Sequence, residues 1–167
     1  GGTNSTASGL IAGNYTVTEV VSTQYTTTYS GCTASVAVGA TTTCTITNND
    51  IAPSLTLNKV LVRNNGGSAS ESDWTLSATG PSTISGPGAV GSPDVVSGPT
   101  FKAGTYTRAE TGGPAGYSAS AWSCTNGVVV NGSSQITLLP GQTTVCSITN
   151  DDIGPRLTVT KIVESTH

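Results

Sequence analysis

Residues 141–163 read GQTTVCSITNDDIGPRLTVTKIV, and residues 39–61 read GATTTCTITNNDIAPSLTLNKVL. The two segments match in register at a spacing of 102 residues, so that Cys44 corresponds to Cys146. Both contain short runs of alternating apolar and polar residues, the pattern of a half-buried β-strand. Self-similarity at a fixed spacing is the signature of a repeated structural unit. The pair of segments therefore predicts an all-β fold with tandem β-sandwich domains.

A second match lies upstream of the first. Residues 12–19 (AGNYTVTE) parallel residues 103–110 (AGTYTRAE), and residues 25–32 (YTTTYSGC) parallel residues 117–124 (YSASAWSC). The two matches divide the chain into an incomplete repeat that lacks its first strand, a complete repeat, and the first strand of a third repeat. We expect these three parts to cover residues 1–52, 53–154 and 155–167.

The two ends of the chain resemble consecutive parts of one repeat. Placed end to end, His167 followed by Gly1, Gly2 and Thr3 reproduces residues 65–68, Asn-Gly-Gly-Ser. Two arrangements fit this observation. The chain is one period of a longer array, or each subunit lends its last strand to the incomplete repeat of the next subunit. Both arrangements predict a linear fibre in which the partner is a copy of the chain itself.

The expected strands alternate with segments rich in Gly, Pro, Ser and Asn. They lie near residues 14–20, 25–31, 43–48, 54–62, 73–78, 104–110, 117–123, 135–139, 143–149 and 156–163. The segment 80–100 is rich in Gly, Pro and Ser and is expected to form a long surface loop.

Composition argues against several classes of function. Charged residues are 9% of the chain and the net charge is −3, so no basic patch is available to neutralise phosphates in a nucleic acid. The apolar stretches are too short to span a membrane. The only histidine is His167, which argues against a Cys/His metal site and against a Cys–His nucleophile. We therefore expect no enzymatic activity and no cofactor.

The four cysteines predict two disulfides in an oxidising, extracellular or cell-surface compartment. Repeat symmetry favours local pairing, because pairing across the repeats would break the correspondence between them. The expected bonds are Cys32–Cys44 and Cys124–Cys146.

Alternation also places three polar residues of each repeat on an otherwise apolar face. They are Lys59, Glu110 and Asn150 in the complete repeat, and Lys161, Glu19 and Asn48 in the strand 156–163 and the incomplete repeat. A buried Lys, Glu or Asn is costly unless it is paired. One residue of each type, present twice, predicts a single mutual site in each repeat.

Several of these segments resemble a known family. The run GTYTRAETGGPAGY (104–117) resembles the Gly-x-Tyr…Glu…Pro-x-Gly-Tyr signature of the B-type repeats of bacterial collagen adhesins and Gram-positive pilins. LTLNK (55–59) is similar to the first strand of these repeats, and SITN (147–150) is similar to the last. The tandem junctions also resemble those of bacterial surface proteins that carry many such repeats. The resemblance covers nearly the whole chain and implies a prealbumin-like, immunoglobulin-like β-sandwich.

The resemblance also implies that the polar site can form an isopeptide bond. Lys59 would be the nucleophile, Asn150 the acceptor and Glu110 the proton shuttle; Lys161, Asn48 and Glu19 would repeat these roles between units. The cysteine pair departs from the family pattern. A disulfide that already links the last strand would leave the three side chains as a hydrogen-bonded cluster, and Lys59 could instead extend to solvent at a strand end.

Two other groups of residues are weaker candidates. Asp50, Asp151 and Asp152 lie at the repeat junctions and could bind Ca²⁺, although their spacing is not that of an EF-hand. Sequons for N-glycosylation start at Asn4, Asn14 and Asn131.

These observations predict a structural subunit or repeat segment of an extracellular bacterial filament or surface stalk, linked head-to-tail by strand complementation. The alternative is an adhesin domain that binds a host or matrix ligand. Exposed aromatic or charged clusters on the long loops would favour the adhesin, and segment 80–100 contains neither.

Overall fold

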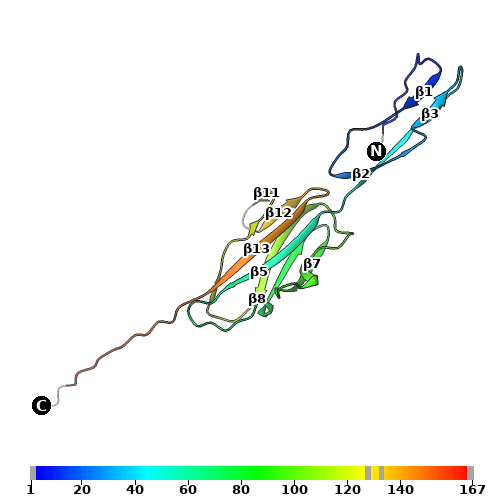
Figure 1. Ribbon diagram of the computed structural model, residues 1–167. Coiled ribbons are helices and arrows are strands. Elements are labelled where there is room, and N and C mark those ends of the chain that lie inside the picture. The colour runs from blue at the N-terminus through cyan, green and yellow to red at the C-terminus, as the bar shows by residue number, and fades with distance from the viewer. Residues whose placement is uncertain (1–2, 127–128, 132–133, 165–167) are drawn as a thin grey trace. The chain divides into compact units, whose positions relative to one another are not determined.

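The computed structural model describes residues 3–126, 129–131 and 134–164. The chain divides into two compact units: unit 1, Gly1–Ile51, and unit 2, Ala52–His167. Apart from two single-turn 3₁₀ helices, η1 (Glu71–Asp73) and η2 (Pro93–Val95), the regular structure of the described residues consists of strands (Figure 1). The all-β class expected from the sequence is confirmed.

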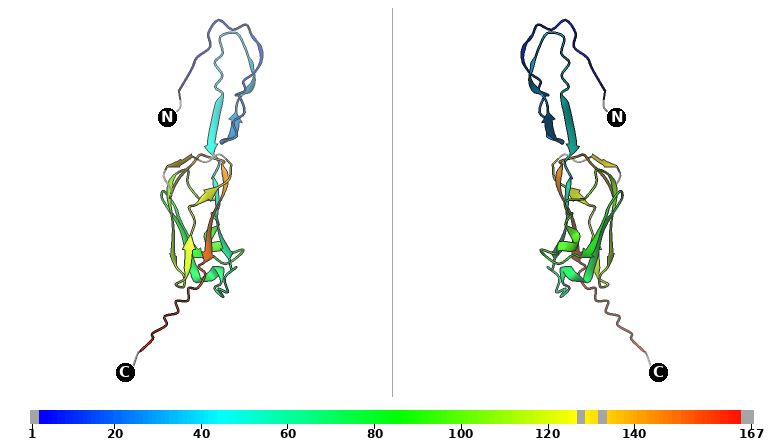
Figure 2. Two further views of the ribbon diagram at one scale, coloured as in Figure 1. Left: turned by 90° about the vertical axis from the view of Figure 1, so that its left-hand side faces the viewer. Right: turned by 90° about the vertical axis from the view of Figure 1, so that its right-hand side faces the viewer.

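Unit 2 is a sandwich of two sheets, seen from its sides in Figure 2. One sheet has the order β10-β13-β5, with β9 also paired to β13; the other has the order β11-β12-β8-β6-β7. The first sheet contains β5 (Ser54–Val62), β9 (Tyr117–Ala119), β10 (Ser123–Cys124) and β13 (Thr143–Asp152). The second contains β6 (Trp74–Thr79), β7 (Thr83–Pro87), β8 (Gly104–Gly112), β11 (Val129–Asn131) and β12 (Gln135–Leu138).

Strands β5 and β13 lie side by side and run parallel, with Cys146 opposite Leu57 and Ile148 opposite Lys59. The sequence leads to this arrangement because both strands alternate apolar and polar residues, and the apolar set of each faces the other sheet. The resulting core contains Leu55, Leu57, Leu76, Ala78, Ile84, Val95, Phe101, Tyr106, Ile136, Leu138, Cys146 and Ile148. The core thus draws side chains from both sheets and from η2.

The prediction of a long surface loop over residues 80–100 is wrong. This segment contains β7, which pairs with β6, and the helix η2. Ile84 and Val95 belong to the core, with exposed fractions of 8% and 3%. The segment is rich in Gly, Pro and Ser, and the only large apolar side chain of β7 is Ile84, so the composition favoured a loop over a strand.

Unit 1 contains two separate two-stranded antiparallel sheets. They pair β1 (Gly13–Thr16) with β3 (Thr33–Val36), and β2 (Tyr25–Ser30) with β4 (Thr45–Asp50). The sequence analysis missed β3 and placed the end of β1 four residues too late. Cys32 is the only buried hydrophobic residue among the described residues of this unit, whereas Val20 and Val21 are about nine-tenths exposed. Unit 1 therefore has strands but almost no core.

Residues 153–164, the tail, have no regular secondary structure, and every residue from Pro155 to Glu164 is exposed. Leu157 and Val159 are 89% and 83% exposed. The strand expected over residues 156–163 is thus not formed in the single chain. A strand needs a hydrogen-bonded neighbour, and the tail has none among the described residues.

Candidate functional site

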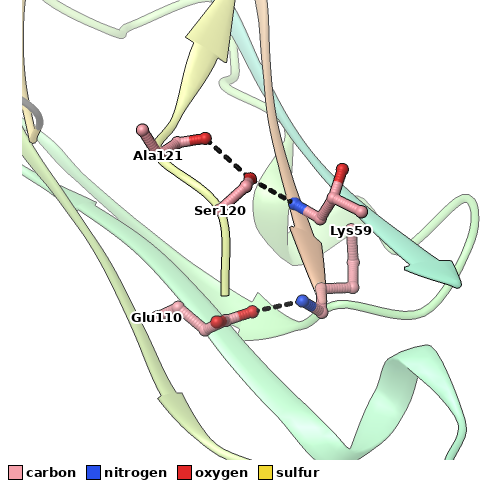
Figure 3. Close-up of polar contacts among 5 residues, drawn as sticks. Lys59, Glu110, Ser120 and Ala121 are labelled. Atoms are coloured by element: carbon pink, nitrogen blue, oxygen red, sulfur yellow. Dashed lines mark hydrogen bonds and ion pairs between the residues drawn. The ribbon is translucent and has the colours of Figure 1, made fainter. Parts of the chain in front are cut away.

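Lys59 and Glu110 form an ion pair inside unit 2. Lys59 lies on β5 and Glu110 lies on β8, so the pair joins the two sheets through the interior. The Lys59 Nζ lies 2.6 Å from Glu110 Oε1, and the two side chains are 0% and 10% exposed. Figure 3 shows the lysine side chain extending toward the carboxylate. The Lys59 Nζ also lies 4.7 Å from the centre of the Trp74 ring, within the range of a cation–π contact.

Burial is the main influence on the Lys59 amine. Desolvation lowers the pKa of Lys59, while the hydrogen bond and charge of Glu110, and the charge of Glu71, oppose this shift. The net pKa lies below the ordinary value of a lysine. The uncharged form of the amine, which is the nucleophilic form, is therefore more accessible here than at the surface.

Asn150 faces the same interior from β13. Its neighbour across the parallel pair is Leu61, two residues after Lys59, so Lys59 and Asn150 project from the same face of the sheet. Asn150 is 3% exposed, and its Oδ1 has no hydrogen-bond partner among the described residues. Two of the three residues selected from the sequence are thus in direct contact, and the third presents an unpaired buried carbonyl from the adjacent strand.

Unit 1 holds the corresponding acid and amide without a lysine. The Asn48 Nδ2 donates to Glu19 Oε1 at 2.8 Å and to Glu19 Oε2 at 3.0 Å. The Thr27 hydroxyl donates to Asn48 Oδ1 at 2.6 Å. Lys161 lies exposed in the tail. The structure therefore brings together the two expected residues that belong to this unit.

The sequence analysis missed Arg108, which is 1% exposed on β8 between Tyr106 and Glu110. Its Nε donates to the Ser134 carbonyl at 3.1 Å, and its Nη1 lies 2.8 Å from Cys124 Sγ. Its guanidinium also lies 5.4 Å from the Trp122 ring. The alternation that placed Tyr106 and Glu110 inward applies equally to Arg108 and could have identified it.

Both disulfides are present, Cys32–Cys44 in unit 1 and Cys124–Cys146 in unit 2. This is the local pairing expected from the repeat. Cys124 on β10 lies directly opposite Cys146 on β13, so the bond reinforces one edge of a sheet.

The calcium interpretation is wrong for Asp152. Its carboxylate accepts hydrogen bonds from the backbone N–H groups of Asn64, Asn65 and Gly67, at 2.6–3.0 Å. Only 5% of this residue is exposed, and the bonds occupy both oxygens. Asp50 and Asp151 are exposed, and the described residues contain no group of three acidic, His or Cys side chains that could hold a metal ion.

Two of the three predicted glycosylation sequons start at asparagines of unit 1. Asn4 and Asn14 are exposed in unit 1. The side chain of Asn131 lies outside the described residues.

Comparison with known families matches residues 50–148 to SpaA_2, a prealbumin-like fold domain. Neither the curated proteins nor the solved structures yielded a significant match. In the described part of the chain, no helix has the length and apolarity needed to cross a membrane.

Proposed function

We propose, from the premise that this chain belongs to the SpaA-type family of prealbumin-like fold domains, that it is a structural unit of an extracellular filament or stalk. The family is one of structural cell-surface domains, as in Gram-positive pilins and surface proteins. In the proposal, each unit is linked to the next by strand complementation. The tail of one unit enters unit 1 of its neighbour.

The observation that carries the proposal is that unit 1 has the strand plan of part of a sandwich. Gly13 lies opposite Val36 and Tyr25 lies opposite Asp50. The corresponding pairs in unit 2 are Gly104 with Leu138 and Tyr117 with Asp152. These pairs show that β1–β3 and β2–β4 have the registers of β8–β12 and β9–β13.

What unit 1 lacks is equally specific. In unit 2, the second edge of β13 is covered by β5, whereas β4 pairs only with β2 among the described residues. Such an edge presents unpaired N–H and C=O groups that can pair with another chain. The near absence of a core adds a second deficit, because small domains that bury little apolar surface are only marginally stable.

The tail carries the side chains that the missing strand requires. At the spacing of 102 residues, Leu157, Val159 and Lys161 correspond to Leu55, Leu57 and Lys59 of β5. Transferring the register of β5 and β13 places Val159 opposite Cys44 and Lys161 opposite Ile46. Full burial of a Leu or Val side chain contributes about 1.5–3 kcal/mol, so insertion removes two large exposed apolar groups from water at a substantial gain.

Complementation in this form leaves unit 1 smaller than unit 2. The tail supplies a counterpart of β5, but no segment of the chain resembles β6 and β7. Because donor and acceptor surfaces differ, the contact does not close on itself and extends as a filament.

A covalent bond at each polar site is the second part of the proposal. The neutral Lys59 amine attacks the Asn150 carboxamide carbon, an amide bond forms, and the leaving nitrogen departs as ammonia. Glu110 moves the proton from the amine to the leaving group. Lys161, Asn48 and Glu19 repeat these roles after strand insertion. Intact-mass analysis tests both bonds. The Lys59–Asn150 bond lowers the mass of the chain by one ammonia, and each Lys161–Asn48 bond joins two units covalently with the loss of one ammonia.

Electron microscopy of the purified full chain tests the assembly. We expect filaments, and we expect Val159→Asp to abolish them by placing a charge on the inserted face. Val90→Asp is the matched control, because Val90 is 85% exposed in unit 2 and Val159 is 83% exposed in the tail. Filaments that persist with Val159→Asp, or a wild-type chain that stays monomeric at high concentration, would contradict the proposal.

A further inference from the structure

Asp152 and Tyr117 hold the loop that follows β5 in unit 2. The two residues lie directly opposite each other on β13 and β9. Asp152 accepts the N–H groups of Asn64, Asn65 and Gly67, and the Tyr117 hydroxyl accepts the N–H of Ala69 at 3.0 Å. The pair therefore binds four backbone groups of the turn immediately after the first strand.

The fit around this turn is close. A Cβ added to Gly67 would lie 2.2 Å from the Tyr117 hydroxyl and 2.9 Å from the Asp152 Cβ. Both distances are too short for a real side chain. The pair therefore selects a turn with consecutive inward N–H groups and glycine at this position.

Unit 1 presents the same pair without an occupant. Asp50 lies directly opposite Tyr25 on β4 and β2, in the register of Asp152 and Tyr117. Asp50 is exposed and Tyr25 is 40% exposed. Neither side chain has a hydrogen-bond partner among the described residues. Their counterparts in unit 2 show what such a pair binds when the first strand of the domain is in place.

We infer that Asp50 and Tyr25 form a docking site for the backbone that continues from the inserted strand of a second copy, where Thr166 and His167 correspond to Asn64 and Asn65 at the spacing of 102 residues. The inference rests on the proposed function, because this backbone arrives only when the tail is inserted beside β4. Asp50 and Tyr25 then fix the register of the inserted strand. A one-residue slip would move this backbone away from the carboxylate and would also turn Leu157 and Val159 to solvent.

Peptide binding to the full chain tests this inference separately from strand insertion. The receptor carries Val159→Asp, so that its own tail does not compete. The short peptide has the sequence of residues 155–164. The long peptide adds residues 63–69, which contain the turn that unit 2 binds. A third peptide is the long one with Gly67→Ala, which places a Cβ against the tyrosine hydroxyl.

We expect the long peptide to bind at least about tenfold more tightly than the short one, since hydrogen bonds to a charged group are the stronger class. Asp50→Asn in the receptor should reduce the affinity of the long peptide to about that of the short peptide. The affinity of the short peptide should not change. Tyr25→Phe should reduce the affinity of the long peptide about two- to fivefold. The Gly67→Ala peptide should bind like the short one.

Asp151→Asn is the matched control, because Asp151 is an exposed carboxylate of unit 2 and should change neither affinity. Equal affinities of the long and short peptides, or insensitivity of the long peptide to Asp50→Asn, would overturn the inference and leave strand insertion standing. Failure of the short peptide to bind at all would instead overturn the proposed function.

Discussion

Units 1 and 2 pair their strands in matching registers, yet only unit 2 encloses a core. Unit 2 buries twelve residues in one apolar cluster, whereas Cys32 is the only buried hydrophobic residue among those described in unit 1. The two units share alternating strands, a disulfide and, at corresponding positions of the repeat, a Glu and an Asn. The difference is β5, β6 and β7, which bring the lysine and close the sandwich. Strand pairing alone therefore produces a scaffold, and the core depends on the strand order being complete.

The largest expected effect concerns the acid at each polar site. Glu110→Ala leaves Lys59 buried without its partner and should lower the free energy of unfolding of unit 2 by about 3–5 kcal/mol. Glu19→Ala removes an exposed carboxylate and should change the isolated chain by less than about 0.5 kcal/mol. Tryptophan fluorescence during chemical denaturation reports unit 2, because Trp74 and Trp122 both lie there, and hydrogen exchange of β2 and β4 reports unit 1. Equal effects in the two units would break the comparison.

Truncation of a strand side chain should likewise destabilise unit 2 more than unit 1. Leu55 is fully buried on β5, and Leu55→Ala should cost unit 2 about 2–5 kcal/mol. Ile46→Ala on β4 should cost the isolated chain much less, because unit 1 has little core to disrupt. In assembled material, Ile46→Ala should become costly as the inserted strand covers it. Hydrogen exchange of β4 before and after assembly measures the change.

Removal of a disulfide should affect unit 1 more than unit 2, which is the reverse of the two preceding predictions. The bond Cys32–Cys44 closes a short loop and contributes about 3 kcal/mol in the chain-entropy model. Replacing both cysteines with serine should abolish hydrogen-exchange protection throughout unit 1 of the isolated chain. The same replacement of Cys124 and Cys146 should weaken unit 2 and leave it folded. Persisting protection in reduced unit 1 would show that it has a stabilising core after all.

The smallest effect is the pH dependence of the loop contact. Burial raises the pKa of Asp152, whereas the hydrogen bonds from Gly67, Asn64 and Asn65 lower it. The hydrogen bonds together outweigh burial, so the net pKa lies below its usual value. The stability that this carboxylate contributes is thus complete above about pH 4 and is lost as the pH falls through the folded-state pKa. Asp152→Asn should flatten the acid limb of unit 2 stability, measured by denaturation at successive pH values. Asp50→Asn should leave the isolated chain unchanged.

Alternation in the sequence predicted much of the interior of unit 2. It placed Leu55, Leu57 and Lys59 inward on one strand and Cys146, Ile148 and Asn150 inward on its neighbour, and all six are buried. This works because the period of side-chain direction in a strand is fixed by the backbone. The prealbumin-like fold followed from short motifs and is confirmed by the family match.

What escaped prediction depended on contacts that leave no periodic signal. The partners of Asp152 are backbone N–H groups more than 80 residues away, and a backbone group has no letter in the sequence. Strand β7 has only Ile84 as a large apolar residue, so composition pointed to a loop. Arg108 was passed over because an arginine is expected at the surface, although a disulfide sulfur and an aromatic ring surround it.

The parallel pairing of β5 and β13 determines how unit 2 would respond to tension. The chain enters β5 at Ser54 and leaves β13 at Asp152, so a pull along the chain draws the two strands past each other. Their backbone hydrogen bonds run across that direction and are loaded together in shear, where rupture requires many bonds to fail at once. A Lys59–Asn150 cross-link would join these same two strands. It would carry the load between entry and exit and leave most of the domain out of the path of force.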